Sequence, residues 1–260
     1  MDLQLQNKVI IVTGGSKGIG LGVVESLLKE DAIPVIVTRN EASVLKVVEA
    51  LKKKGKDVFY TLAELTDPEQ CENAVKSVID KYGRIDGLVN NAGVNDGVGL
   101  ESGNYQGFME SLKRNVVHYY LMAHYALPEL KKSKGAIVNI GSKTADTGQG
   151  GTSGYAASNG GRNALTREWA LELLPYAIRV NAVIVAECDT PQYDNWIKTF
   201  SNPEDTLANI TKNIPLGKRM TTIEEIGDTV VFLLSNKSSH TTGQLLYVDG
   251  GYTHLDRALE

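Results

Sequence analysis

Short runs of apolar, mostly β-branched residues alternate along this chain with longer segments whose apolar positions recur at helical spacing. The short runs predict strands, and each is followed by a segment of helical period or by a turn that opens one. The predicted strands cover residues 8–13, 34–38, 57–62, 86–93, 135–142, 178–185 and 244–251. The predicted helices run from a glycine-rich turn to about residue 30, and over 41–55, 68–82, 105–132, 155–174 and 223–234, with two short helices before the last.

Alternating strands and helices, with strands that are apolar throughout, predict a parallel sheet covered by helices on both faces. The seven strands fit one doubly wound, Rossmann-type α/β sandwich of three layers. In such a sheet ligands gather at the carboxyl ends of the strands, where the strand order reverses. No linker, charge run or low-complexity segment divides the 260 residues, so we expect one domain over residues 1–260.

Composition excludes several other classes of protein. A net charge of −4 argues against a nucleic-acid partner. The two cysteines, Cys71 and Cys188, are too few for a disulfide framework, and the four histidines form no pair at metal-ligand spacing, so no metal is expected. The first residues contain no long apolar run, so neither a signal peptide nor a membrane partner is expected and a cytoplasmic location follows.

The first predicted strand runs into the stretch TGGSKGIG, residues 13–20, in which Gly14, Gly18 and Gly20 are spaced as in a phosphate-binding turn. Glycines let the backbone approach a pyrophosphate, and the helix that opens here offers free N–H groups. The alternative is a tight turn needed only for packing. The position between a first strand and a first helix favours nucleotide binding.

The second predicted strand ends in Thr38-Arg39-Asn40, without the carboxylate that would bind the ribose 2′-hydroxyl of NAD. Arg39 could pair with a 2′-phosphate, assisted by Lys17 from the glycine-rich turn. These features favour NADP, with NAD possible. The alternative is that Arg39 is an exposed loop residue.

Four motifs together resemble the short-chain dehydrogenase/reductases: TGGSKGIG, NNAG at residues 90–93, a serine ahead of Y-x-x-x-x, and YVDGGY. Several stretches further resemble the bacterial L-fucose and related aldose dehydrogenases, namely NNAGVNDGVGL, SKTADTGQGGTSGY, DNWIKTF and HTTGQLLYVDGGYTHLDRAL. The resemblance implies hydride exchange between a nicotinamide cofactor and a sugar hydroxyl or hemiacetal, oxidising an L-fucose-like aldose to the lactone. It also implies a homotetramer.

The resemblance assigns catalytic roles to Tyr155 as acid/base, to Ser142 as hydrogen-bond partner of the substrate oxygen, and to Asn115 as holder of a relay water. It implies a larger set of cofactor-binding residues, in which Asn91 also braces the sheet and Cys188 is a small apolar lining residue. The set is Gly14, Ser16, Lys17, Gly18, Ile19, Gly20, Arg39, Glu64, Leu65, Asn91, Ala92, Gly93, Tyr155, Asn159, Cys188 and Thr190. Val185-Ala186 depart from the family's Pro-Gly before that threonine.

A sugar needs paired hydroxyls, so the substrate pocket should be polar. The candidates are Asn95, Lys143, Gln149, Glu187 and Trp196, with Asp96, Thr144, His254 and Arg257 as further possibilities. Taken singly, each could be an ordinary surface residue. The aromatic-rich HYYLMAHYAL in the long helix is interpreted as core and subunit interface.

Asn159 is the largest departure, because the family has a lysine one turn after the tyrosine. That lysine lowers the tyrosine pKa and holds the nicotinamide ribose; asparagine can keep only hydrogen bonding. A cation ~5 Å away at an effective dielectric near 20 contributes about 3 kcal/mol, on the order of a hundredfold in tyrosinate. Lys143 could replace the charge, whereas Arg162 is interpreted as a solvated or interface residue.

Three interpretations of Asn159 remain open. The chain is an enzyme impaired at neutral pH, or a weak or inactive nucleotide-binding homologue acting as a sensor or partner subunit, or an ordinary enzyme with an introduced substitution. Because Ser142, Tyr155 and Asn115 are all retained, we favour the enzyme.

Overall fold

The fold is built on one parallel sheet of seven strands in the computed structural model, which describes residues 2–255. The strands are β1 (Val9–Thr13), β2 (Ile33–Thr38), β3 (Phe59–Leu62), β4 (Gly87–Asn90), β5 (Ala136–Ser142), β6 (Arg179–Val185) and β7 (Leu245–Val248). Their spatial order is β3-β2-β1-β4-β5-β6-β7, and every neighbouring pair is parallel. The predicted doubly wound sheet is confirmed, and its strand order reverses between β1 and β4.

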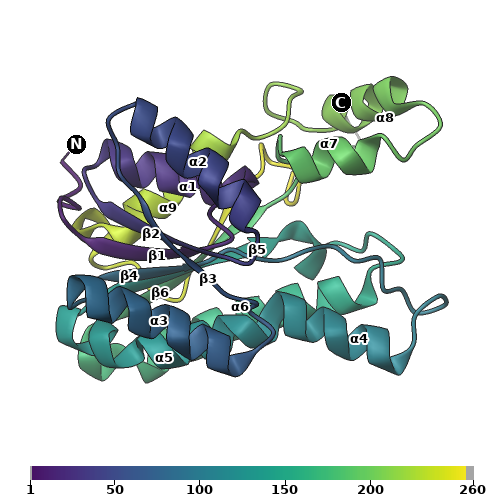
Figure 1. Cartoon of the computed structure of the whole chain (residues 1–260). Coiled ribbons are helices and arrows are strands. Elements are labelled where there is room, and N and C mark those ends of the chain that lie inside the picture. The colour runs from purple at the N-terminus through teal and green to yellow at the C-terminus, as the bar shows by residue number, and fades with distance from the viewer. Residues whose placement is uncertain (1, 256–260) are drawn as a thin grey trace.

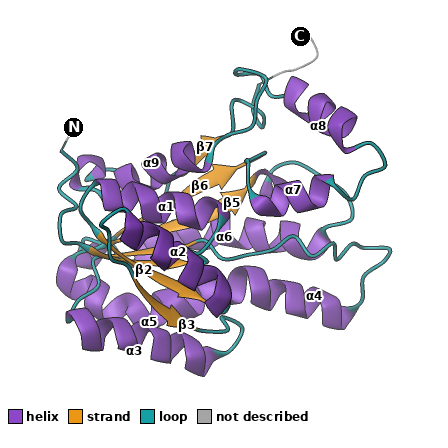
Figure 2. Ribbon diagram, turned by 45° about the horizontal axis from the view of Figure 1, so that its top comes forward, coloured by secondary structure: helices purple, strands orange, loops and turns teal. Residues whose placement is uncertain are grey.

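Helices cover both faces of the sheet, as the alternating sequence pattern requires (Figure 1). One face carries α1 (Gly18–Lys29), α2 (Glu41–Lys53) and α9 (Ile223–Leu234), and the other carries α3 (Pro68–Tyr82), α5 (His118–Ser133) and α6 (Ser153–Glu172). Figure 2 shows the strands enclosed between these two helical layers.

The two layers meet the sheet through alternate residues of each strand. In β1, Ile10 and Val12 join the hydrophobic cluster under α1 and α9, while Val9 and Ile11 join the cluster under α3 and α5. Because successive strand side chains point to opposite faces, one apolar strand supplies both clusters. This explains why the strands are apolar throughout and do not alternate with polar residues.

The helix predicted over residues 105–132 is not continuous, and this correction bears on the site. It consists of α4 (Tyr105–Leu112), a π-helical turn (Lys113–Val117) and α5. A π turn adds one residue to a helical turn, and such turns occur often at functional sites. The apolar period on each side remains helical, so the sequence pattern does not reveal the interruption.

The two short helices predicted before the last helix are present. They are α7 (Pro191–Ile197) and α8 (Pro203–Lys212). In Figure 1 these two helices are green and lie above the carboxyl ends of the strands, whereas α4 lies below them. Short 3₁₀ segments at Lys143–Ala145, Leu174–Tyr176 and Asn236–Ser238 complete the described elements. None of the helices in residues 2–255 has the length and apolarity needed to cross a bilayer.

Candidate active site

The glycine-rich turn between β1 and α1 is folded tightly on itself. Gly14 has a φ of +68°, a left-handed conformation that favours glycine, and its N–H donates to Val37 O at 2.8 Å. A Cβ on Gly20 would lie 2.4 Å from the carbonyl oxygen of Gly14 and 2.6 Å from Asn91 Nδ2. No larger residue fits there. The turn thereby brings the N-terminus of α1 to the sheet edge, which suits a cofactor pyrophosphate.

Asn91 ties the ends of the two strands that flank the reversal point. Its Nδ2 donates to Thr13 O at 2.8 Å, and the backbone N–H groups of Asn91 and Ala92 donate to Thr13 Oγ1 at 2.9 and 3.1 Å. Asn91 therefore braces the sheet as the resemblance implied. Thr13 was not among the predicted site residues, although its place at the end of a strand before the glycine turn could have indicated it.

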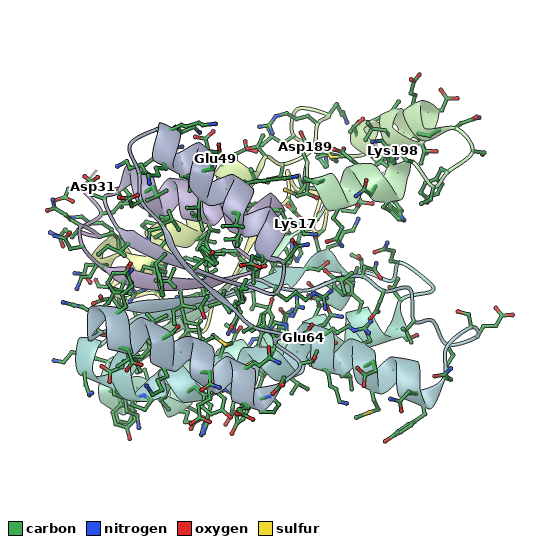
Figure 3. All side chains as sticks on the ribbon, viewed as in Figure 1. Lys17, Asp31, Glu49, Glu64, Asp189 and Lys198 are labelled. Atoms are coloured by element: carbon green, nitrogen blue, oxygen red, sulfur yellow. The ribbon has the colours of Figure 1, made fainter. Side chains whose placement is uncertain are left out.

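Arg39 and Glu64, both predicted to bind the cofactor, form an ion pair in which Arg39 Nη1 lies 2.8 Å from Glu64 Oε2. Burial alone would raise the pKa of Glu64, but hydrogen bonds from Arg39 and Thr66 lower it below its ordinary value. Lys17 is exposed and Leu65 is buried. Lys17 and Glu64 both lie toward the carboxyl edge of the sheet in Figure 3, on opposite sides of it.

Thr190, at the start of α7, lies against the glycine-rich turn. It caps α7 by accepting a hydrogen bond from the N–H of Tyr193 at 3.2 Å. A Cβ on Gly18 would lie 3.4 Å from Thr190 Cγ2, so the turn and the cap are in contact. Ser16 lies in the glycine-rich turn, Ile19 in the first turn of α1, and Gly93 in the loop after β4.

Ser142 is the last residue of β5, and its hydroxyl is oriented by the residue two positions later. Ser142 Oγ accepts from the N–H of Thr144 at 3.3 Å and from Thr144 Oγ1 at 3.1 Å. Since a serine hydroxyl has one hydrogen and two acceptor sites, its own hydrogen is left to donate. A Cβ on Gly141 would lie 3.4 Å from Asn163 Oδ1, so β5 ends directly against α6.

Tyr155 and Asn159 lie one turn apart on α6, as predicted. Tyr155 is half-buried in the first turn of the helix, whereas Asn159 is fully buried. Asn159 Nδ2 donates to the Tyr155 carbonyl oxygen at 2.9 Å, and its Oδ1 accepts from Arg162 Nη1 at 2.9 Å.

Asn115 lies in the π turn, and its side chain links the loop after β4 to the end of α4. Its Oδ1 accepts from the N–H of Val94 at 2.8 Å, and its Nδ2 donates to Ser111 O at 3.0 Å. Its carbonyl oxygen accepts from Arg162 Nε at 2.6 Å. The backbone carbonyl of Asn115, the residue that the resemblance implies holds a relay water, is thus bonded to an arginine.

The prediction that Arg162 is solvated or at an interface is wrong. The residue is 3% exposed, and its guanidinium lies between α6, the π turn and the end of β5. Tyr155, Asn159 and Arg162 are spaced i, i+4 and i+7, which places all three on one helix face. This spacing could have indicated from the sequence that Arg162 lies on the same buried helix face as Asn159. The π turn and the end of β5 supply the acceptors that make burial tolerable.

Lys143 and Glu187 form an ion pair in which both side chains are only 12% exposed. Lys143 Nζ also lies 3.9 Å from the ring centroid of Tyr252. The charge of Lys143 is balanced by Glu187, so Lys143 does not replace a lysine at position 159. The structure instead brings two predicted substrate residues together next to Ser142.

The other predicted substrate residues are divided between buried and exposed positions. Asp96 Oδ1 accepts from Ser111 Oγ at 2.8 Å, Asn95 Oδ1 accepts from the N–H of Gly97 at 3.3 Å, and Thr144 is buried. Trp196 is 39% exposed and makes edge contacts with Tyr193 and Phe200. Gln149 is exposed, His254 packs against Tyr247, and Arg257 lies outside the described residues.

Cys188 is buried and borders the segment that leads to Thr190. Burial raises the pKa of its thiol to about 12, with smaller contributions from Asp189 and Glu225. A thiol of this kind stays protonated at neutral pH and is no nucleophile. Among the described residues, no group of three histidine, cysteine or acidic side chains is arranged to hold a metal ion.

Known proteins are similar in sequence to this chain over nearly its whole length. A family model described as enoyl-(acyl carrier protein) reductase matches residues 14–253. The L-fucose dehydrogenase of Bos taurus is 33% identical over 252 residues, covering 96% of this chain and 91% of that protein. The 3-oxoacyl-(acyl-carrier-protein) reductase FabG of Chlamydia pneumoniae is 34% identical over 255 residues, covering 98% of this chain and 100% of that protein.

A solved structure shows the same fold at higher identity. The crystal structure of Cj0485 dehydrogenase matches with a TM-score of 0.94 and 46% sequence identity, covering 100% of this chain and 99% of that chain. Relatives of two kinds, a sugar dehydrogenase and acyl-thioester reductases, are therefore similar to this chain.

Proposed function

The chain belongs to the short-chain dehydrogenase/reductase family of NAD(P)-dependent oxidoreductases, and we propose that it oxidises an L-fucose-like aldose to its lactone with NADP. The observation that carries the sugar assignment is the mostly buried Lys143–Glu187 pair next to Ser142. Charged side chains at a substrate site favour a ligand with many hydroxyls, because an apolar ligand would shield them from water without offering hydrogen bonds. The similarity to a mammalian L-fucose dehydrogenase supports the same substrate class.

The second candidate is reduction of a 3-oxoacyl thioester, which the similarity to FabG favours. An acyl chain is apolar and gains most from an apolar channel. Asp96, Lys143 and Glu187 offer it charged groups instead, so the aldose is the better fit.

In the proposed reaction Tyr155 and Ser142 act on the anomeric hydroxyl of the sugar. Ser142 donates its free hydroxyl hydrogen to that oxygen, and Tyr155 accepts the hydroxyl proton as the carbon–oxygen double bond forms. A bound nicotinamide cofactor supplies the acceptor for the hydride that leaves the anomeric carbon. The proton passes on from Tyr155 toward solvent.

The preference for NADP is supported by two cations at the adenosine end. Arg39 and Lys17 are both exposed there. Arg39 uses one nitrogen for Glu64, and its remaining donors are available to a 2′-phosphate.

A homotetramer is proposed from the exposed apolar residues at the outer layer. Val117 and Tyr120 by α5, and Leu171 and Leu174 by the end of α6, are large hydrophobic side chains exposed to solvent. Such residues on neighbouring helices suit subunit contacts.

The experiment mixes the protein with NADP or NAD and a panel headed by L-fucose, D-arabinose and L-galactose, and follows absorbance of the reduced cofactor. Tyr155→Phe should lower turnover by about 10²- to 10⁴-fold while cofactor affinity holds. Tyr105→Phe, at an exposed tyrosine of α4, is the matched control and should change nothing. Conversion of a 3-oxoacyl thioester without aldose oxidation would favour the second candidate. Cofactor binding with no turnover of either would favour a nucleotide-binding homologue.

A further inference from the structure

The guanidinium of Arg162 is bonded to three separate elements beneath the catalytic helix. Nε donates to Asn115 O at 2.6 Å, and Nη1 donates to Ile140 O at 3.1 Å and to Asn159 Oδ1 at 2.9 Å. Nη2 makes a longer contact of 3.5 Å with Asn115 Oδ1. The π turn, the end of β5 and α6 are thus connected by one side chain.

All of these acceptors are uncharged, and within residues 2–255 no carboxylate forms an ion pair with Arg162. Burying a charge without a counter-charge is unfavourable, so its presence calls for a reason beyond packing. The guanidinium carbon lies 4.4 Å from the ring centroid of Tyr119 and 5.9 Å from that of Tyr155. The positive charge therefore faces the ring of the predicted catalytic tyrosine.

The charge of Arg162 also affects the pKa of the neighbouring His118. Burial, and next the charge of Arg162, lower the pKa of His118 to about 3. The titratable groups around the guanidinium are Tyr155 on α6, and Tyr119 and His118 on α5. Since His118 stays neutral at working pH, Arg162 is the charged group closest to Tyr155 among them.

Both polar atoms of the Asn159 side-chain amide are hydrogen-bonded within this cluster. It donates to the Tyr155 carbonyl and accepts from Arg162. A lysine at position 159 would remove the acceptor and bring a second cation against the first. The residues at 159 and 162 therefore form a coupled pair.

We propose that Arg162 is the active-site cation of this enzyme, supplying from the i+7 position the positive charge that a lysine at 159 would otherwise provide. It is a positioning residue that holds Asn115 and Asn159 and stabilises negative charge developing on the Tyr155 oxygen during proton transfer. This inference rests on the proposed oxidoreductase function at the same site. Asn159 is then the partner of a relocated charge and not a defect.

The first test compares Arg162→Lys, which keeps a cation, with Arg162→Gln, which keeps donors but no charge. The Gln variant should lose turnover near neutral pH by about a hundredfold and recover at alkaline pH. The Lys variant should keep the wild-type pH profile with a smaller loss. Arg167→Gln, an exposed arginine further along α6, is the matched control. Equal losses and equal pH profiles for Lys and Gln would overturn the assignment of a charge role.

A second readout does not depend on substrate or cofactor. Near-ultraviolet absorbance follows tyrosinate formation with pH, and subtracting the Tyr155→Phe titration isolates the Tyr155 step. This step should move to higher pH in Arg162→Gln and stay in place in Arg162→Lys. A step that stays in place in both overturns the inference even where no sugar is turned over, whereas a missing sugar activity with the expected shift overturns only the proposed substrate.

Two further variants test the inference if Arg162→Gln does not fold. Asn159→Lys alone should give no gain, because two cations then meet in a buried site, whereas Asn159→Lys with Arg162→Met should restore turnover and thermal stability together. A gain of tenfold or more from Asn159→Lys alone would show that Arg162 does not supply the charge.

Discussion

The amide oxygen of Asn159 accepts a hydrogen bond of 2.9 Å from the guanidinium of Arg162, three residues further along the same helix. This contact joins Asn159, which stands where the family has a lysine, to Arg162, the only lysine or arginine among residues 2–255 that is more than nine-tenths buried. The departure and the cation are best understood together, because without Arg162 the buried Oδ1 of Asn159 would lose its hydrogen-bond donor.

The first prediction follows from that contact. Asn159→Asp places a carboxylate against Arg162 and cancels its charge, so turnover near neutral pH should fall at least about tenfold while the buried ion pair preserves the melting temperature. Asn159→Leu removes the acceptor without adding charge and should lose less turnover. Steady-state rates and thermal unfolding of the purified variants measure both effects. Wild-type turnover in the Asp variant would contradict the role of the charge.

The second prediction concerns the phosphate turn. Gly20→Ala forces a Cβ to within 2.4 Å of Gly14 O, so it should lower the free energy of unfolding by about 1–3 kcal/mol. Cofactor affinity should fall as well, by about tenfold, which corresponds to a loss of about 1.4 kcal/mol in binding free energy. Chemical denaturation and fluorescence titration measure the two quantities.

The control for that variant is a second glycine in a helix. A Cβ on Gly160 would meet nothing within 4 Å, so Gly160→Ala should raise the free energy of unfolding by about 0.5–1 kcal/mol through helix propensity. If the two substitutions were equally harmful, the crowding at Gly20 would not be the cause.

The third prediction tests cofactor choice at the adenosine end. Arg39→Ala should weaken NADP binding by about 10- to 100-fold and leave NAD binding within about twofold, because only NADP carries the 2′-phosphate. Glu64→Gln breaks the ion pair with Arg39 and should strengthen NADP binding, since a competing carboxylate is removed. Calorimetric titration with each cofactor measures the effects, and equal losses for NAD and NADP in Arg39→Ala would argue against the assignment.

The fourth prediction concerns the Lys143–Glu187 pair. Lys143→Met leaves a mostly buried carboxylate unpaired and should lower the free energy of unfolding by about 3 kcal/mol. Lys143→Met combined with Glu187→Leu should regain most of that stability, but the KM for the sugar should stay raised by about tenfold, a loss of 1.4 kcal/mol. Denaturation curves and sugar saturation curves separate the two effects. A double variant with wild-type sugar KM would remove the pair from the substrate site.

The fifth prediction is a pH dependence of stability. Hydrogen bonds from Arg219 and Thr222 lower the pKa of Glu225 to about 2, from an ordinary value of 4.5. Because the folded pKa is depressed, the stabilisation is fully present above 4.5 and is lost as the pH falls toward about 2. Glu225→Gln should remove this acid-labile contribution, whereas Glu49→Gln, in an exposed ion pair on α2, should not. Melting temperatures across acidic pH provide the measurement.

The sequence by itself determined the sheet, the phosphate turn and the helical spacing of Tyr155 and Asn159. Hydrophobic period and glycine placement are local properties, and local backbone geometry follows from them directly. The sequence also indicated which edge of the sheet binds ligands, because a doubly wound parallel sheet has one point where the strand order reverses.

Only the tertiary structure decided where the charges go. The π turn at Asn115 is one extra residue within a helical pattern, which the pattern does not reveal. Arg162 is buried because that turn and the end of β5 present carbonyl oxygens to it, and these elements are distant in sequence. Lys143 is paired because Glu187 follows the neighbouring strand β6. Whether a side chain is solvated or buried depends on the elements packed against it, and that information lies outside any short stretch of sequence.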